Sequence, residues 1–232
     1  MYLTVIIPTY NEAQNVAILI NKIFEVLLQN GLDGEVIVVD DDSPDRTWEI
    51  AQQLQSSHDN LNVLRRPHKR GLTSAVLDGI ALARGEIIGV IDGDLSHPAE
   101  KIPELIKPIL HGEADLVVGS RYVKGGYIEN WTLKRRFLST LATLVVRGLT
   151  PIKDPMSGFF FFRKEVIEGV KLSPNGSKIG LDILVKGNFK HAAEVPIQFG
   201  NRQYGKSKLS VGVIMASLFQ VLRLYLYRLC SF

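Results

Sequence analysis

The sequence has almost no cysteine, and this scarcity limits the chemistry available to it. Cys230 is the one cysteine among 232 residues, so an internal disulfide is excluded and cysteine supplies no metal-binding set. The five histidines show no zinc-ligand spacing either. A single thiol suits a protein of a reducing compartment.

The sequence also lacks a large excess of positive or negative charge. Lys and Arg number 27 against 24 Asp and Glu, and the net charge of +3 is too small to indicate a nucleic-acid partner. The basic residues nevertheless cluster at residues 65–66, 69–70, 134–136 and 202–208. These clusters are either solvated surface or sites for phosphate or anionic lipid, and composition leaves both open.

A third absence concerns long apolar runs. Residues 137–149 and 211–229 are rich in apolar side chains, but neither segment holds the roughly 18 uninterrupted apolar residues of a membrane-spanning helix. Tyr225 and Tyr227 lie beside arginines in the second segment, a mixture typical of an amphipathic helix at a membrane interface. A helix packed on the protein core is the alternative.

The chain also lacks Gly-x-Gly-x-x-Gly after its first apolar run, which argues against an ordinary NAD enzyme. It does alternate apolar runs with amphipathic segments, and this pattern predicts a Rossmann-like α/β fold with a mostly parallel sheet. Strands are expected at residues 5–8, 35–40, 61–64, 86–91, 115–119, 159–162 and 193–197. Helices are expected at residues 16–27, 45–54 and 71–83, the first of them capped by Thr9 or Asn11.

The apolar run at residues 87–91 ends in two carboxylates one residue apart, Asp92 and Asp94, followed by Ser96 and His97. Open α/β sheets place their ligands at the carboxyl edge of parallel strands. Two carboxylates there can hold Mg²⁺ or Mn²⁺, because hard cations take oxygen ligands and keep positions for substrate phosphates. The alternative is a polar loop in which Ser96 caps the next helix.

Two other expected strands end in polar residues, at residues 8–12 and 40–43. Because the carboxyl ends of parallel strands meet at the same edge of a sheet, we expect these residues and the Asp92–Asp94 pair to form one site.

Six motifs together resemble one known family. They are residues 5–12 (VIIPTYNE), 39–45 (VDDDSPD), 92–98 (DGDLSHP), 119–122 (GSRY), 154–158 (DPMSG) and 202–209 (RQYGKSKL). On these motifs the chain resembles glycosyltransferase family 2, whose members have the GT-A fold. It is more closely similar to the dolichol-phosphate mannose synthases and related polyprenyl-phosphate glycosyltransferases. The resemblance spans nearly the whole chain.

The resemblance implies roles for the matching residues. The nucleotide-sugar pocket would be lined by Pro8, Tyr10, Glu12, Asp40, Asp42, Asp92, Gly93, Asp94, Arg202 and Lys208. Asp92 and Asp94, with Ser96 beside them, would hold Mg²⁺ or Mn²⁺ on the donor diphosphate. The acceptor phosphate would be met by Arg121, Arg135 and Ser139. Asp94, Arg121 and Arg202 would be the catalytic residues.

The implied reaction moves mannose from GDP-mannose to dolichyl or polyprenyl phosphate with inversion. A phosphate monoester has a second pKa of about 6, so it is largely dianionic at neutral pH and needs no His or Glu as general base. Two alternatives stay open: UDP-glucose as the donor, or a hydroxyl acceptor, for which Asp94 or Asp154 would act as base. A binding subunit without turnover is the non-enzyme alternative, and the intact acids and arginines argue against it.

Residues 1–208 would then form the catalytic domain and residues 209–232 a membrane-interface segment. The catalytic domain would lie at the cytosolic face of a membrane, with basic residues near the apolar segments facing anionic headgroups. The chain is either a peripheral form that uses a membrane-anchoring partner subunit or a piece of a longer protein.

Overall fold

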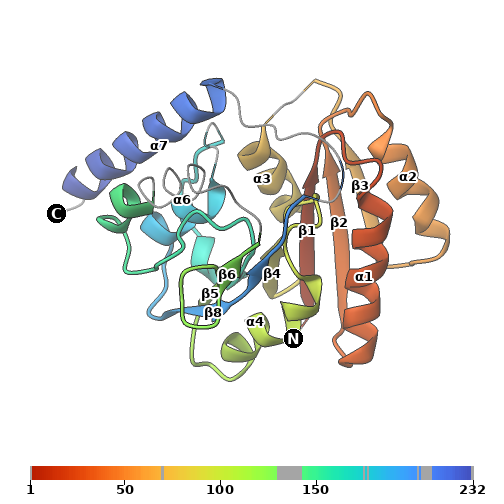
Figure 1. Ribbon diagram of the computed structural model, residues 1–232, viewed down its shortest axis with the longest axis horizontal. Coiled ribbons are helices and arrows are strands. Elements are labelled where there is room, and N and C mark those ends of the chain that lie inside the picture. Colours follow the sequence, from red (N-terminus) through yellow and green to blue (C-terminus); the bar gives the residue numbers. More distant parts are fainter. Residues whose placement is uncertain are drawn as a thin grey trace.

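A seven-stranded sheet forms the centre of the computed structural model, in the order β3-β2-β1-β4-β7-β5-β8 (Figure 1). The structure describes residues 2–68, 71–129, 143–174, 176, 178–202, 204 and 211–230. The strands are β1 (Leu3–Thr9), β2 (Gly34–Asp40), β3 (Leu61–Arg65), β4 (Ile87–Val90), β5 (Leu116–Ser120), β7 (Phe160–Arg163) and β8 (Ala192–Pro196). All neighbours pair in parallel except β7, which runs antiparallel between β4 and β5. The predicted α/β fold with a mostly parallel sheet is confirmed.

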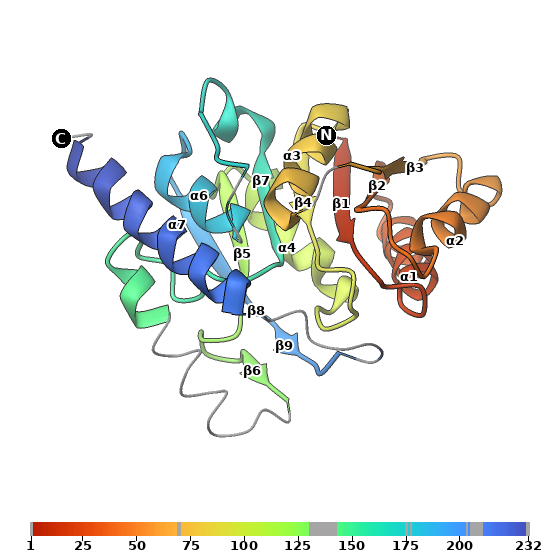
Figure 2. The same cartoon turned by 90° about the horizontal axis from the view of Figure 1, so that it is seen from above.

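Helices cover both faces of this sheet, as Figure 2 shows for α1 and α3 on opposite sides of β1. The α-helices include α1 (Val16–Gln29), α2 (Thr47–Gln53), α3 (Leu72–Leu82), α4 (Ile102–Leu110), α6 (Ile179–Lys186) and α7 (Val211–Cys230), and residues 143–147 are also helical. Short 3-10 turns lie at Leu54–Ser56, Ala99–Lys101 and Lys164–Ile167. A second sheet consists of two short parallel strands, β6 (Tyr127–Ile128) and β9 (Gln198–Phe199).

Alternation along the strands builds two cores, one on each face. Val5 and Ile7 of β1 face the core formed with α1, α2 and α4, whereas Ile6 faces the core formed with α3 and α6. The Phe run does the same, since Phe159 and Phe161 lie in the first core and Phe160 and Phe162 in the second. Residues buried on both faces explain why these strands read as continuous apolar runs in the sequence.

The predicted helix caps are wrong. Helix α1 begins after Asn15, and no side chain caps it. The Thr9 hydroxyl instead donates to Asp40, and the Asn11 backbone N–H donates to Ser43 Oγ at 2.9 Å. The Thr9 hydroxyl and the Asn11 backbone therefore bind residues at the end of β2 and just after it, and sequence spacing does not reveal these contacts.

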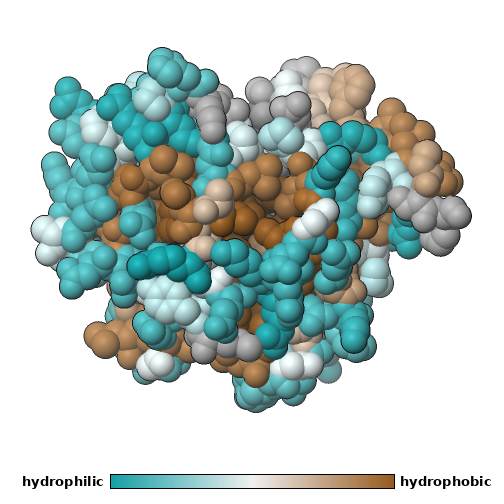
Figure 3. All heavy atoms as spheres, turned by 180° about the vertical axis from the view of Figure 1, so that it is seen from behind, coloured by the Kyte–Doolittle hydropathy of each residue, from teal (hydrophilic) through white to brown (hydrophobic). Residues whose placement is uncertain are grey.

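Helix α7 lies beyond α6 at the β8 side of the molecule and packs against it through Leu224 (Figures 1 and 2). Its arginines turn toward the protein: Arg223 donates to Ser173 Oγ at 2.5 Å, and Arg228 donates to the Leu149 carbonyl at 2.7 Å. Many apolar side chains of this helix are exposed, namely Met215, Leu218, Phe219, Leu222, Leu226 and Leu229. Figure 3 shows hydrophobic atoms gathered at this end of the molecule.

Membrane crossing is not expected of α7 or of the other helices that the structure describes. Among the described residues, no helix combines the length and apolar character needed to cross a membrane. Arg223 and Arg228 each donate a hydrogen bond to the protein and are also exposed, so the expectation that arginines in this segment meet lipid headgroups stays a prediction.

Strand β7 fits between its neighbours because Gly89 of β4 has no side chain. A Cβ at position 89 would overlap the ring of Phe161, the residue paired with Gly89 across the β4–β7 ladder. The Phe161 ring is fully buried, so it has little room to move aside.

Gly89→Ala should therefore lower the free energy of unfolding by about 1–3 kcal/mol, the range typical of overpacking a core. Urea unfolding followed by circular dichroism measures this change. Gly200→Ala is the matched control, because the nearest atoms to a Cβ at position 200 lie 3.9 Å away. Equal losses in the two variants would contradict the packing explanation.

Candidate active site

Strands β1, β2 and β4 end side by side at one edge of the sheet, as the sequence predicted. Thr9 pairs with Asp40 at the ends of β1 and β2, and Ile6 pairs with Val90 at the end of β4. The residues after these strands therefore converge, and they include most of the candidate site residues.

Asp40 holds two of these strand ends together. Its carboxylate is fully buried and accepts hydrogen bonds from the Thr9 hydroxyl at 2.7 Å, the Ser43 hydroxyl at 2.7 Å and the Ser43 backbone N–H at 2.8 Å. Pro8 lies buried within β1, and the half-buried Tyr10 follows at the exit. The structure thus gives Asp40 a structural task at the rim of the expected nucleotide pocket.

Asp42 lies further out, in a left-handed backbone conformation with φ of 54°. Its carboxylate accepts a hydrogen bond from Arg65 Nε at 2.6 Å, and the Arg65 guanidinium lies 3.9 Å from the centre of the Trp48 ring. Both side chains of this pair are partly exposed, at 30% for Asp42 and 42% for Arg65.

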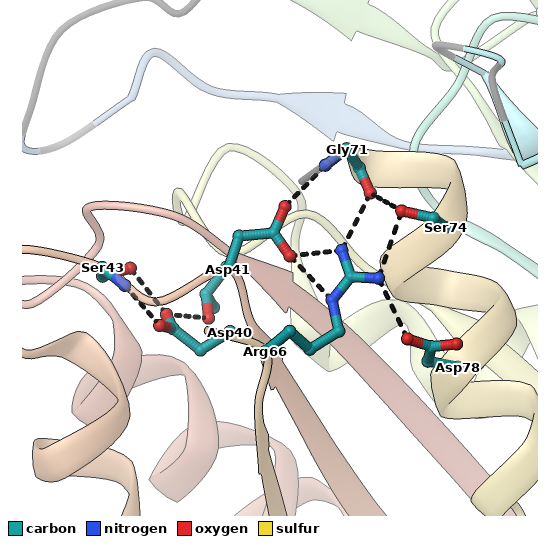
Figure 4. A network of polar contacts seen from close by, with 8 residues as sticks. Asp40, Asp41, Ser43, Arg66, Gly71, Ser74 and Asp78 are labelled. Atoms are coloured by element: carbon teal, nitrogen blue, oxygen red, sulfur yellow. Dashed lines mark hydrogen bonds and ion pairs between the residues drawn. The ribbon is translucent and has the colours of Figure 1, made fainter. Parts of the chain in front are cut away.

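A buried network that the sequence did not reveal lies next to this pair (Figure 4). Arg66 pairs with Asp41 through Nε and Nη2, and its Nη1 lies 3.1 Å from both Ser74 and Asp78. The Gly71 backbone N–H completes the set by donating to Asp41 at 2.7 Å. Arg66 is therefore neither solvated surface nor an accessible phosphate site, because its side chain is only 2% exposed.

Asp94 is surrounded by donors. Ser96 donates to Asp94 Oδ1 from its hydroxyl at 2.5 Å and from its backbone N–H at 3.1 Å. Arg202 donates to Asp94 Oδ2 from Nε at 3.1 Å and from Nη2 at 2.9 Å, and its Nη1 lies 3.8 Å from Glu12. The structure thus brings Glu12, Asp94, Ser96 and Arg202 together.

Asp92 stands beside Asp94 in sequence but has different neighbours. Its Oδ2 lies 3.5 Å from Nε2 of the buried His97. Burial raises the pKa of Asp92, but the His97 imidazole and the charges of Lys178 and Arg121 outweigh this effect and bring the pKa below its usual value. Asp92 is therefore an ionised carboxylate at neutral pH.

Two glycines permit close approach around these acids. A Cβ at Gly158 would overlap the Asp92 carboxylate, so the loop before β7 touches Asp92 with its backbone. A Cβ at Gly93 would lie 3.2 Å from Thr9 Cγ2, which shows how closely the end of β4 follows β1.

The donor set at Asp92, Asp94 and Ser96 fits a hard divalent cation in part. Among the described residues, no group of three or more His, Cys, Asp or Glu side chains could hold a metal ion. Two carboxylates and a hydroxyl are nevertheless the kind of oxygen set that Mg²⁺ shares with substrate phosphates. These three residues could therefore supply oxygen ligands to such a cation and leave its remaining positions to other oxygen donors.

Arg121 forms a bidentate pair with Asp154. Arg121 Nε and Nη2 each donate to an Asp154 oxygen at 2.7 Å, and the Arg121 backbone N–H donates to Asp154 Oδ2 at 2.9 Å. Burial lowers the pKa of Arg121, but the hydrogen bonds to Asp154 raise it above its usual value, so the guanidinium stays charged. Asp154 is fully buried and both of its oxygens are engaged, which opposes the alternative that it acts as a general base.

Residues 197–202 connect the acids to Arg121. The Phe199 ring meets the His97 ring edge-on at 4.9 Å, and the Arg121 guanidinium lies 5.1 Å from the centre of the same ring. The Gly200 backbone N–H donates to the Ser96 carbonyl at 2.9 Å, and Arg202 follows with its bonds to Asp94. Sequence reasoning missed Phe199 and His97 as members of the site, although His97 lies within the DGDLSHP motif.

Three predicted site residues, Arg135, Ser139 and Lys208, lie outside the described residues.

The two adjacent arginines Arg65 and Arg66 provide a matched test of the buried network. Arg66→Met should lower the free energy of unfolding by about 3 kcal/mol or more, because it leaves Asp41 buried without its partner. Arg65→Met removes an exposed pair and should cost no more than about 1 kcal/mol. Thermal and urea unfolding measure both changes, and similar losses would show that burial of Arg66 does not set its contribution.

Comparison with known proteins identifies the family. The sequence model of the family described as Glycosyl transferase family 2 matches residues 4–170. The chain is 49% identical over 228 residues to a dolichol-phosphate mannosyltransferase of Pyrococcus furiosus, which covers 97% of this chain and 64% of the relative. Enzymes of the same name from Mycosarcoma maydis and Saccharomyces cerevisiae are 37% and 36% identical, and the chain covers 79% and 87% of their lengths.

Solved structures agree on the fold. Glucosyl-3-phosphoglycerate synthase from Mycobacterium tuberculosis, in complex with Mn²⁺, UDP-glucose and phosphoglyceric acid, matches with a TM-score of 0.67 at 22% identity, over 98% of this chain and 79% of that one. Mannosyl-3-phosphoglycerate synthase from Rubrobacter xylanophilus matches with a TM-score of 0.67 at 20% identity, over 100% and 74%. The family match includes the ends of β1, β2 and β4 that carry the acids, and the fold is that of GT-A glycosyltransferases, so the chain belongs to glycosyl transferase family 2.

Proposed function

We propose that this protein transfers mannose from GDP-mannose to dolichyl or polyprenyl phosphate, with inversion at the anomeric carbon. The observation that carries the proposal is the arrangement of two acids and two arginines at one sheet edge, Asp92 and Asp94 beside Arg202 and Arg121. The mannosyltransferases that are 36% to 49% identical to this chain support mannose as the sugar and dolichol phosphate as the acceptor.

The donor diphosphate is proposed to bind between Asp94 and Arg202. Arg202 is 23% exposed, and its planar guanidinium suits phosphate oxygens as well as the carboxylate that it contacts here. A divalent cation held by Asp92 and Asp94, with Ser96 beside them, would neutralise the charge that develops on the leaving diphosphate. The Mn²⁺ in the M. tuberculosis synthase complex supports this cofactor class.

The acceptor phosphate is proposed to bind at Arg121. Because the phosphate is largely dianionic at neutral pH, it attacks without losing a proton to the protein. Catalysis then depends on positioning and on electrostatic stabilisation by charged side chains. The engagement of Asp154 with Arg121 supports this acceptor over a hydroxyl, which would need a nearby base.

A bilayer surface is proposed to cover the outward face of α7, within a segment spanning residues 209–232 that follows a catalytic domain of residues 1–208. The face carries apolar side chains, such as Phe219 at 67% exposure and Leu229 at 75%, while Arg223 and Arg228 bind the protein. An exposed row of apolar side chains is typical of an interfacial helix, in which a bilayer covers these side chains instead of water. A lipid acceptor would then enter from the same surface. The same proposal places the protein at the cytosolic face of the membrane and includes a partner subunit that anchors it there.

The proposal is tested by a transfer assay. The full chain, Mn²⁺ and a short-chain polyprenyl phosphate are incubated in parallel with labelled GDP-mannose and labelled UDP-glucose, and label in the organic phase is counted. Label from GDP-mannose alone is the expected result. Label from UDP-glucose alone would assign the other donor, and no label from either would overturn the polyprenyl-phosphate acceptor.

The metal role of the two acids has its own test. Asp92→Asn and Asp94→Asn should each weaken Mn²⁺ binding by at least about tenfold, because each removes a charged oxygen ligand. Binding is measured from the electron paramagnetic resonance signal of free Mn²⁺, in the presence of GDP. Asp59→Asn removes the same charge from an exposed position and should leave the affinity unchanged. Turnover near that of the unmodified chain in either acid variant at saturating Mn²⁺ would contradict the mechanism.

A further inference from the structure

Glu194 makes an unusual contact for a residue in a strand. It lies in β8, opposite Val118 of β5, and is half-buried. Its two carboxylate oxygens accept hydrogen bonds from two successive backbone N–H groups, Lys153 at 2.9 Å and Asp154 at 3.0 Å. Successive N–H groups form an anion-binding concavity, so a charged carboxylate is the group that fits it.

The segment that Glu194 holds carries the partner of Arg121. Asp154 is fully buried, and its side chain orients the Arg121 guanidinium through two hydrogen bonds of 2.7 Å. The Arg121 backbone N–H also donates to the Asp154 carboxylate, so Asp154 joins the end of β5 to the loop before β7. The position of Arg121 therefore depends on the position of the Asp154 backbone.

We infer that Glu194 is a positioning residue for the acceptor phosphate, acting through Asp154 on Arg121. This inference rests on the proposed function, because it takes Arg121 as the group that meets the acceptor phosphate. Glu194 touches neither the metal-binding acids nor Arg202 in the contacts described above, so its effect is directed to the acceptor and not to the donor.

Glutamine is the sharpest replacement for Glu194. It keeps the size of the side chain, but its amide has one oxygen, and its NH₂ group would face a second backbone N–H that also donates. One of the two hydrogen bonds is therefore lost and the loop is released on one side.

The test measures KM for both substrates in the full chain, with GDP-mannose, Mn²⁺ and a short-chain polyprenyl phosphate. Glu194→Gln should raise KM for polyprenyl phosphate about tenfold, the effect of one charge-assisted hydrogen bond, with KM for GDP-mannose unchanged. Glu168→Gln, at an exposed position, is the matched control and should alter neither value. A general loss of structure would raise both KM values together and would overturn the inference.

A second pair of variants separates positioning from packing. Glu194→Asp keeps the charge and both oxygens, so it should restore KM for polyprenyl phosphate part of the way, and absence of rescue would count against the inference. In an Arg121→Lys background, Glu194→Gln should add less than about twofold to that KM, because its route to the phosphate has already been removed. Additive effects would show that Glu194 acts elsewhere.

The same experiment distinguishes failure of the proposed function from failure of the role given to Glu194. Failure of the unmodified chain to transfer sugar to polyprenyl phosphate would overturn the proposed function and this inference with it. Transfer by the unmodified chain, with equal changes in the two KM values in Glu194→Gln, would overturn this inference alone.

Discussion

The antiparallel insertion of β7 between two parallel strands is the constraint on which the site depends. A parallel strand brings its exit to the carboxyl edge of the sheet, whereas β7 brings its entry there. The loop before β7 therefore arrives beside Asp92, with Gly158 in contact with the carboxylate and Asp154 in contact with Arg121. The fit of Phe161 over Gly89 is what allows β7 to occupy this place.

Arg66, Arg121 and Arg202 each have a carboxylate partner at this end of the sheet, and the exposure of their side chains differs. Arg66 is 2% exposed, so its pair with Asp41 fixes the position of a loop. Arg121 is 8% exposed and holds the loop before β7 through Asp154, and under the proposed function it also meets the acceptor phosphate. Arg202 is 23% exposed and contacts Asp94, which the proposed function places on the donor side. Under the proposed function, an incoming diphosphate competes with Asp94 for Arg202, and this exchange needs the more accessible arginine.

Local pattern was sufficient for the seven strands of the main sheet, its mostly parallel character and the meeting of Pro8–Glu12, Asp40–Ser43 and the Asp92–Asp94 pair at one edge. It did not reveal that β7 runs antiparallel. It failed where a side chain is used by a distant partner. Thr9 has the chemistry of a helix cap but bonds Asp40, 31 residues away. Arg66 has the chemistry of a surface cation but is buried against α3. Its partners Asp41 and Asp78 are distant in the sequence, so no local pattern predicts that they bind it. The arginines of α7 likewise use partners distant in the sequence, since Arg223 donates to Ser173 and Arg228 to the Leu149 carbonyl.

The pair of Asp94 with Arg202 joins residues 108 positions apart, and the family-wide sequence match ends at residue 170. A chain emerging from the ribosome therefore presents Asp94 well before Arg202 exists to pair with it. Until β8 and Arg202 are added, Asp94 lacks its arginine partner and β5 has an open edge. Assembly of the site is consequently a late event of synthesis, completed from the carboxyl-terminal side.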